Sequence, residues 1–255
     1  MKMAVVQPKK TINPLDEARK YIDQLCDEGV DAIFFPEYFL QREGKPIPLG
    51  DNYITTLRTI AKEKAIHVVT GVYELGNYSS CIIVDPSGNI IGMHRKTIRA
   101  RRDVQELEIS SGNKLDVFET QMGKIGICIC IENWFPENPR VLRLKGAEIV
   151  FAPSEFGMKW AQGDYLERWR MLYIVRAIEN EAYYVACTNA VGEQPLAMVV
   201  DPEGLVLAER HSEGALLAEL NMEKVRMLQT DKVKPYYCAN IRMNIRRPEL
   251  YKPLC

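Results

Sequence analysis

Residues 124–154 read KIGICICIENWFPENPRVLRLKGAEIVFAPS, and the order of apolar and polar residues in this stretch decides the fold class. The apolar runs 124–130 and 147–152 have the length and composition of buried strands. Between them, residues 136–145 begin with a proline and then follow the pattern of a helix. The stretch therefore predicts a strand, a helix and a second strand in succession, which is typical of an α/β fold.

The same alternation extends in both directions from this stretch. Further strands are expected at residues 2–7, 31–36, 66–73 and 182–189, and further helices at 13–28, 52–65 and 165–181. Two hairpins are expected at 80–92 and 197–208, each turning on Asp-Pro-x-Gly, in which proline fixes φ and glycine takes the left-handed position. The two halves of the chain show a similar order of strands and helices, so we expect two sheet layers covered by helices.

Composition sets limits on the class of protein. The chain has 255 residues, and no linker or low-complexity segment divides it, so we expect a single domain over residues 1–255. Its net charge of −1 gives no global attraction to nucleic acid or to an anionic membrane, and neither partner is expected. The seven cysteines are scattered, and the sequence shows neither a run of about 18 apolar residues nor a signal-peptide pattern. We therefore expect a cytoplasmic protein.

Cys130 is the first candidate for chemistry, because it ends an apolar strand just before a polar turn and a helix. That geometry presents a nucleophile beside free backbone N–H groups, whereas a buried structural thiol is the alternative. Cys128 lies on the same face of a continuing strand, so periodicity does not choose between the two thiols. No nearby Cys or His completes a metal site, and the three histidines are isolated, so no metal is expected.

Glu37 and Lys96 are candidates for acid–base and charge roles. Glu37 ends an apolar strand within Phe-Phe-Pro-Glu-Tyr-Phe, where loss of solvent raises a carboxyl pKa toward the range of a general base. A solvent-facing glutamate at a strand end is the alternative. Lys96 lies in the basic run Arg95–Arg102, which on its own favours either a solvated loop or an anion- or nucleic-acid-binding patch.

The joint arrangement of these motifs resembles the nitrilase, or carbon–nitrogen hydrolase, superfamily. The matching motifs are FPE at 35–37, RKT at 95–97 and GICICIEN with FPE at 126–137, and further similar segments lie at 145–154, 176–192, 201–208 and 246–251. The family triad maps onto Glu37, Lys96 and Cys130. Cys130, unlike Cys128, stands two residues before an acid and five before Phe135, as the family nucleophile does.

The resemblance implies a four-layer α-β-β-α sandwich, assembly into a homodimer or higher homo-oligomer, and hydrolysis of a non-peptide C–N bond without metal or cofactor. Cys130 would attack the substrate while Glu37 accepts its proton. Lys96 and the backbone N–H of Ile131 would hold the oxyanion. The leading reaction is that of an aliphatic amidase that releases ammonia through a thioester. N-carbamoyl amine or nitrile hydrolysis by the same triad, and non-enzymatic anion binding through Arg95–Arg102, are the alternatives.

The substrate pocket is less well defined by the motifs. Its candidate acids are Glu106, Glu132 and Glu155. The family's second pocket glutamate would fall at position 105, which is glutamine, so Glu106 is one residue out of register, and His94 stands where most members have tyrosine. The three arginines Arg99, Arg101 and Arg102 favour a substrate with a carboxylate, such as a dicarboxylate half-amide, and three solvated arginines are the alternative. Glu155 instead argues for a substrate amine, or pairs with one of the arginines and leaves the pocket neutral.

Overall fold

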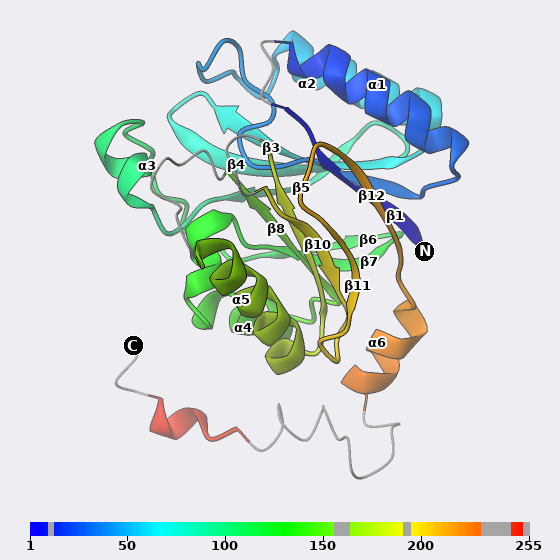
Figure 1. Cartoon of the computed structure of the whole chain (residues 1–255). Coiled ribbons are helices and arrows are strands. Elements are labelled where there is room, and N and C mark those ends of the chain that lie inside the picture. The colour runs from blue at the N-terminus through cyan, green and yellow to red at the C-terminus, as the bar shows by residue number, and fades with distance from the viewer. Residues whose placement is uncertain (10–12, 156–163, 191–194, 231–245, 252–255) are drawn as a thin grey trace.

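A computed structural model describes residues 1–9, 13–155, 164–190, 195–230 and 246–251, and its strands form two sheets that face each other (Figure 1). The first sheet consists of β12 (Gly214–Glu219), β1 (Lys2–Gln7), β2 (Ala32–Phe34), β3 (His67–Glu74), β4 (Tyr78–Val84) and β5 (Ile90–Arg95), in that spatial order. The second consists of β11 (Val206–Arg210), β10 (Ala197–Val200), β9 (Tyr183–Thr188), β8 (Ile149–Ser154), β7 (Gly123–Ile127) and β6 (Val117–Thr120).

Helices cover the outer face of each sheet. The helices are α1 (Pro14–Asp27), α2 (Asn52–Lys64), α3 (Arg101–Gln105), α4 (Glu137–Leu144), α5 (Tyr165–Asn180) and α6 (Met222–Gln229), with short 3-10 helices at Cys130–Trp134 and Pro248–Leu250. Figure 1 shows α1 and α2 on one side of the paired sheets and α4 and α5 on the other. The four-layer α-β-β-α sandwich expected from the sequence is thereby confirmed.

Apolar side chains fill the space between the sheets and beneath the helices. Phe34 of the first sheet and Phe151 of the second have ring centroids 4.9 Å apart, so the inner faces pack directly on each other. A second cluster, which includes Ile22 and Leu57, lies between the first sheet and its two helices. A single domain over residues 1–255 stays a prediction. No helix in the described part of the chain is long and apolar enough to cross a membrane.

The two sheets have the same topology. In each, three strands are parallel (β1, β2, β3 and β7, β8, β9), a hairpin follows, and one antiparallel strand lies at the opposite edge. Both predicted hairpins are confirmed, with Gly88 at φ +80° and Gly204 at φ +91° in their turns. The outer strand of the first sheet, β12, comes from late in the chain and pairs with β1, so the second half completes the first sheet.

Candidate active site

Glu37 lies three residues after β2, in a loop that runs closely over β3. The backbone N–H of Gly71 donates to the Pro36 carbonyl at 3.1 Å, and Leu40 N–H donates to the Gly71 carbonyl at 2.9 Å. A Cβ on Gly71 would lie 2.3 Å from the Pro36 oxygen and 2.7 Å from the Cα of Glu37. Only glycine therefore lets this loop approach the strand so closely, and that approach positions the Glu37 carboxylate.

The ammonium of Lys96 lies between two buried carboxylates. Its Nζ is 2.8 Å from Glu37 Oε1 and 2.8 Å from Asp103 Oδ2, and its side chain is 1% exposed. The Ser79 hydroxyl donates to the same Glu37 oxygen at 2.9 Å, and the Tyr38 hydroxyl donates to Asp103 Oδ1 at 3.2 Å. The structure thus brings together two predicted residues and adds Asp103, which the sequence reasoning missed.

Burial and charge both act on the protonation of this group. Burial raises the pKa of Glu37; the charge of Lys96 opposes this effect and that of Asp103 reinforces it, so the pKa stays above its usual value. For Lys96, burial alone would lower the pKa, but the charges of Glu37, Cys130 and Asp103 raise it well above its ordinary value. A permanently charged lysine therefore stands beside a carboxylate that is a better base than an exposed glutamate.

The turn after β7 holds Cys130 in an uncommon backbone conformation. The strand ends at Ile127, not at residue 130 as the apolar run predicted, and Cys130 opens the following 3-10 helix with φ +50°. The side-chain amide of Asn133 donates to the Cys128 carbonyl at 3.0 Å and to the Cys130 carbonyl at 2.8 Å. These bonds stabilise the left-handed conformation, which costs of order 1–3 kcal/mol for a non-glycine residue and is common at functional sites.

The charges of the other predicted catalytic residues act on the pKa of the Cys130 thiol. Burial raises its pKa and the charge of Glu37 raises it further, while Lys96 and a hydrogen bond from the Glu155 backbone lower it. The same Glu155 N–H donates to Glu37 Oε2 at 3.0 Å. Ile131 follows Cys130 in the first turn of the 3-10 helix, where backbone N–H groups have no partner within the helix.

Cys128, the competing thiol, has a different environment. It is fully buried in the core between the sheets, and the Tyr184 hydroxyl donates its hydrogen bond to Asn133 Oδ1. Burial raises the pKa of Cys128 well above the ordinary value, and neither Glu37 nor Lys96 contributes to that shift. Within the described residues, no cluster of three or more His, Cys, Asp or Glu side chains could hold a metal ion.

Glu106, predicted as a pocket residue, lies away from the candidate triad. Its side chain is 69% exposed and pairs with Arg102 at 3.6 Å on the outside of α3. The carboxylate that reaches Lys96 belongs to Asp103, which lies three residues earlier, within α3. Glu106 follows the last residue of α3, and its exposed side chain faces solvent, so the structure places this predicted pocket residue outside the buried group around Lys96.

Glu132, the second predicted pocket acid, is fully buried and has no oxygen left for a substrate. Its Oε1 accepts hydrogen bonds from the backbone and hydroxyl of Thr97 at 2.7 and 2.5 Å. Its Oε2 accepts from His94 Nε2 at 2.9 Å and from the Ile129 backbone at 2.6 Å. Burial would raise the pKa of Glu132, but these donors hold it below the usual value. Its contacts are those of an internal cross-link.

Glu155, the third predicted acid, lines a small pocket beside Glu37 together with Asn189. Its carboxylate is paired with Arg102 at 2.5 Å and accepts a hydrogen bond from Asn189 Nδ2 at 3.4 Å. The charge of Arg102 is thus compensated within the protein. Of the two readings of Glu155 that the sequence left open, the structure shows the arginine pair.

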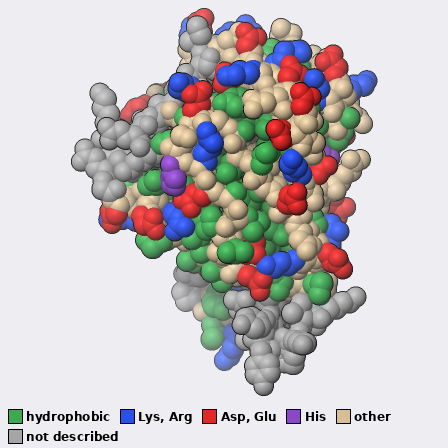
Figure 2. Space-filling model, turned by 45° about the vertical axis from the view of Figure 1, so that its right-hand side comes forward, with side chains coloured by type: hydrophobic (Ala, Val, Ile, Leu, Met, Phe, Trp, Pro, Cys, Tyr) green, Lys and Arg blue, Asp and Glu red, His purple; other side chains and the backbone are tan. Residues whose placement is uncertain are grey.

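The remaining basic residues of the run Arg95–Arg102 also have partners: Arg95 bonds to Glu74, Arg99 to the carbonyl of Ile109 and Arg101 to Gln105. The carboxylates of Glu74 and Glu155 compensate the charges of Arg95 and Arg102, whereas Arg99 and Arg101 have neutral partners and keep their charges. Two such charges are fewer than an extended phosphate-binding patch brings together. On the face drawn in Figure 2, basic and acidic side chains are interspersed, and neither sign of charge dominates. The structure therefore gives no support to the anion-binding alternative.

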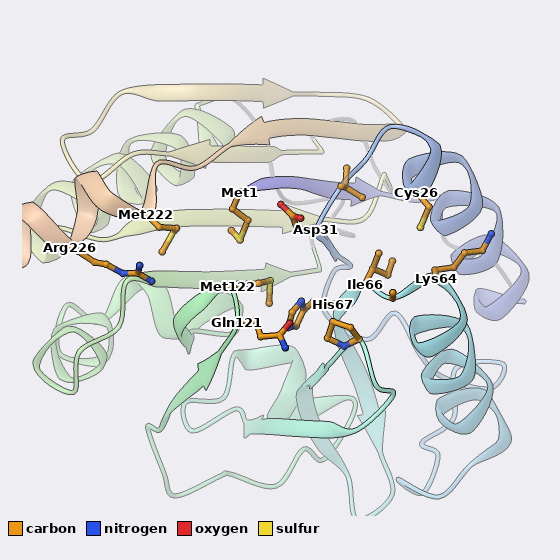
Figure 3. A pocket seen from close by; sticks show the side chains of 13 residues that line it. Met1, Cys26, Asp31, Lys64, Ile66, His67, Gln121, Met122, Met222 and Arg226 are labelled. Atoms are coloured by element: carbon orange, nitrogen blue, oxygen red, sulfur yellow. The ribbon is translucent and has the colours of Figure 1, made fainter.

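A larger pocket, of about 450 Å³, lies at the opposite ends of the strands (Figure 3). Residues near the starts of β2, β3 and β7 line it, whereas Glu37 and Cys130 follow the other ends of β2 and β7. Cys26 and His67 lie well apart in Figure 3, so this pocket holds no thiol–imidazole pair. None of the three predicted catalytic residues lines it.

Comparisons with known proteins agree with this architecture. The family profile described as carbon-nitrogen hydrolase matches residues 2–229. An N-carbamoylputrescine amidase of Solanum lycopersicum is 29% identical, over 88% of this chain and 82% of that protein. An omega-amidase of Xenopus tropicalis is 28% identical, over 97% and 94%. The crystal structure of a Helicobacter pylori carbon-nitrogen hydrolase superposes with a TM-score of 0.86 at 18% identity, covering 100% of this chain and 97% of that one.

Proposed function

The chain belongs to the carbon–nitrogen hydrolase (nitrilase) family and is a hydrolase of the amidase type, and from this premise we propose that Cys130, Glu37 and Lys96 hydrolyse a small carboxamide to an acid and ammonia. The observation that carries the proposal is the Lys96 ammonium, buried between Glu37 and Asp103 and acting on the Cys130 thiol. A nucleophile, a base and a cation in one buried group are what acyl transfer needs.

The first half of the reaction forms a thioester. Glu37 takes the thiol proton as the sulfur of Cys130 bonds to the amide carbon, and the carbonyl oxygen becomes an oxyanion. An ammonium has three protons, of which Lys96 directs two toward Glu37 and Asp103, so the third is available for the oxyanion with the N–H of Ile131. When the oxyanion collapses the C–N bond breaks, and Glu37 gives its proton to the departing nitrogen as ammonia.

The second half releases the acid. Glu37, again a carboxylate, removes a proton from a water molecule that attacks the thioester carbon. The same oxyanion donors serve again, the C–S bond breaks, and Glu37 returns the proton to the sulfur of Cys130. The raised pKa of Glu37 suits this alternation, because a base must also act as an acid within one cycle.

The pocket wall supports an uncharged substrate. Arg102, the arginine that pairs with the pocket residue Glu155, is already neutralised there, so a substrate carboxylate would have to displace Glu155 from this partly buried ion pair. The Asn189 side-chain oxygen is buried and has no hydrogen-bond partner among the described residues, so it offers an acceptor for a substrate N–H. We therefore favour a neutral aliphatic amide over the half-amide that the arginines of the sequence suggested.

An N-carbamoyl amine is the second candidate substrate. One relative is an N-carbamoylputrescine amidase, and the Glu155 carboxylate lies in the pocket wall where it could attract an ammonium group. Binding of this kind requires Glu155 to exchange Arg102 for the substrate cation.

The test measures ammonia release from butyramide, its ω-carboxylate analogue succinamate, an N-carbamoyl diamine and butyronitrile, at low and high salt. We expect butyramide to have the highest kcat/KM, and added hydroxylamine to divert the product to a hydroxamate, as a thioester requires. A tenfold preference for succinamate at both salt concentrations would refute the uncharged pocket. Ammonia from none of the amides would refute the amidase assignment.

A further inference from the structure

Glu132 is a heavily hydrogen-bonded buried carboxylate near the candidate site. It is completely buried, and its two oxygens accept four hydrogen bonds of 2.5–2.9 Å from Thr97, His94 and Ile129. None of these partners touches a substrate in the reaction proposed above. The bonds therefore call for an explanation other than substrate binding.

The partners of Glu132 flank the catalytic candidates on both sheets. Thr97 directly follows Lys96 and His94 precedes it by two residues, at the end of β5 in the first sheet. Ile129 directly precedes Cys130, after β7 in the second sheet. The two sheets are separate hydrogen-bonded units, so in the described part of the chain no ladder of backbone hydrogen bonds fixes Lys96 relative to Cys130. The single carboxylate of Glu132 bonds to both segments at once.

We propose that Glu132 is a positioning residue that fixes the distance between the Lys96 ammonium and the Cys130 thiol by joining the two sheets where those residues emerge. This inference rests on the proposed roles of Lys96 and Cys130. Glu132 touches no reacting atom, and its contribution is to hold the oxyanion donor and the nucleophile in one geometry. Misplacement of such groups by about 1 Å can cost about 10²-fold in rate.

Only a carboxylate fits this position, because all four partners are donors. A glutamine has one acceptor oxygen, and its NH₂ group would face at least one backbone N–H, either Thr97 or Ile129. The substitution Glu132→Gln keeps the volume of the side chain but disrupts one side of the cross-link in either amide orientation. The matched control is Glu148→Gln, which removes another buried carboxylate, bonded to Lys124 N–H and Arg226. Glu148 lies just before β8, beside the start of β7 and thus at the opposite end of that strand from Cys130.

The experiment compares wild type, Glu132→Gln and Glu148→Gln by kcat and KM for butyramide and by thermal unfolding. It also measures the pH dependence of Cys130 alkylation by iodoacetamide, in a Cys128→Ala background so that the peptide carries one thiol. We expect Glu132→Gln to lower kcat by about 10- to 100-fold with KM within twofold, because the reacting groups are misplaced while the pocket is intact. Its alkylation midpoint should move to higher pH, since Lys96 no longer supports the thiolate. Glu148→Gln should leave both kcat and the alkylation midpoint unchanged, even if this variant unfolds at a lower temperature.

A second variant covers the case in which Glu132→Gln does not fold. Thr97→Val removes one of the four hydrogen bonds without changing shape, and we expect kcat to fall about three- to tenfold with the same upward shift in the alkylation midpoint. Wild-type kcat and an unshifted midpoint in either folded variant would overturn the proposal. Alkylation of Cys130 does not require turnover. If the protein hydrolyses no amide, the proposed function is refuted, but the alkylation comparison still decides whether Glu132 positions Lys96 and Cys130.

Discussion

Replacing Lys96 by glutamine should damage both catalysis and folding, in amounts that follow from its surroundings. The Nζ lies 2.8 Å from each of two buried carboxylate oxygens, so the substitution leaves Glu37 and Asp103 without their common cation. Removing one member of a buried ion pair typically costs about 3–5 kcal/mol of unfolding free energy. Losing an oxyanion donor typically costs about 10²–10³ in kcat.

The stability loss should depend on pH in a defined direction. Without the Lys96 charge, the pKa of Glu37 rises further above the ordinary glutamate value of 4.5, because Lys96 lowers it in the wild type. A carboxyl group whose folded-state pKa is raised destabilises the fold as the pH rises through that pKa, and has no such effect below its unfolded pKa. The gap between variant and wild type should therefore be widest near pH 8 and narrow as the pH falls toward 4.5.

Urea unfolding at several pH values and ammonia release between pH 6 and 9 test this reasoning together. The variant should show kcat lowered by about 10²–10³ throughout the range. Activity within threefold of wild type at any pH in this range would remove Lys96 from the mechanism. A stability gap that widens as the pH falls would contradict the pairing with Glu37.

Three further substitutions test neighbouring parts of the site. Gly71→Ala should lower kcat by about tenfold or more and the free energy of unfolding by about 1–3 kcal/mol, because the added Cβ would push the loop of Glu37 away from β3. Unchanged kinetics would show that this loop does not position the base. Asp103→Asn removes a charge that raises the pKa of Glu37, so the acid limb of the kcat/KM profile should move to lower pH, and an upward shift would contradict that coupling. Glu106→Gln should leave kcat/KM within twofold of wild type, since its exposed carboxylate faces solvent, and a tenfold loss would return it to the pocket.

Much of the fold could be predicted from local patterns. The strand–helix alternation and the Asp-Pro-x-Gly turns are local signals, and both hairpins form where they were expected. The edge strands β6 and β12 were missed, because they are partly exposed and lack a clear alternation of buried and exposed residues. β12 in addition pairs with β1 from the other end of the chain, which no local window reveals. Assembly into a homodimer or higher oligomer stays a prediction.

Residues of the candidate site could be predicted where a sequence motif contains them. They could not be predicted where the path of a loop determines which side chain reaches the site. Glu37, Lys96 and Cys130 were chosen from their motifs, and their catalytic roles remain predictions. Asp103 was missed because the carboxylate that reaches Lys96 depends on how the chain turns into the short helix α3, which has no periodic signal. Its one sequence cue is that it is the first acid after the basic run. The cross-link by Glu132 could not be predicted, because two of its partner residues, His94 and Thr97, come from the facing sheet.

The identity of the nucleophile is the central claim, and the most direct test compares two alanine variants of neighbouring thiols. Ammonia release and thermal unfolding are measured for Cys130→Ala and Cys128→Ala beside the wild type. Cys130→Ala should release no ammonia while unfolding near the wild-type temperature, and Cys128→Ala should stay active and lose about 1 kcal/mol or less of packing. An inactive Cys128→Ala beside an active Cys130→Ala would contradict the assignment of the nucleophile and of the turn that holds it.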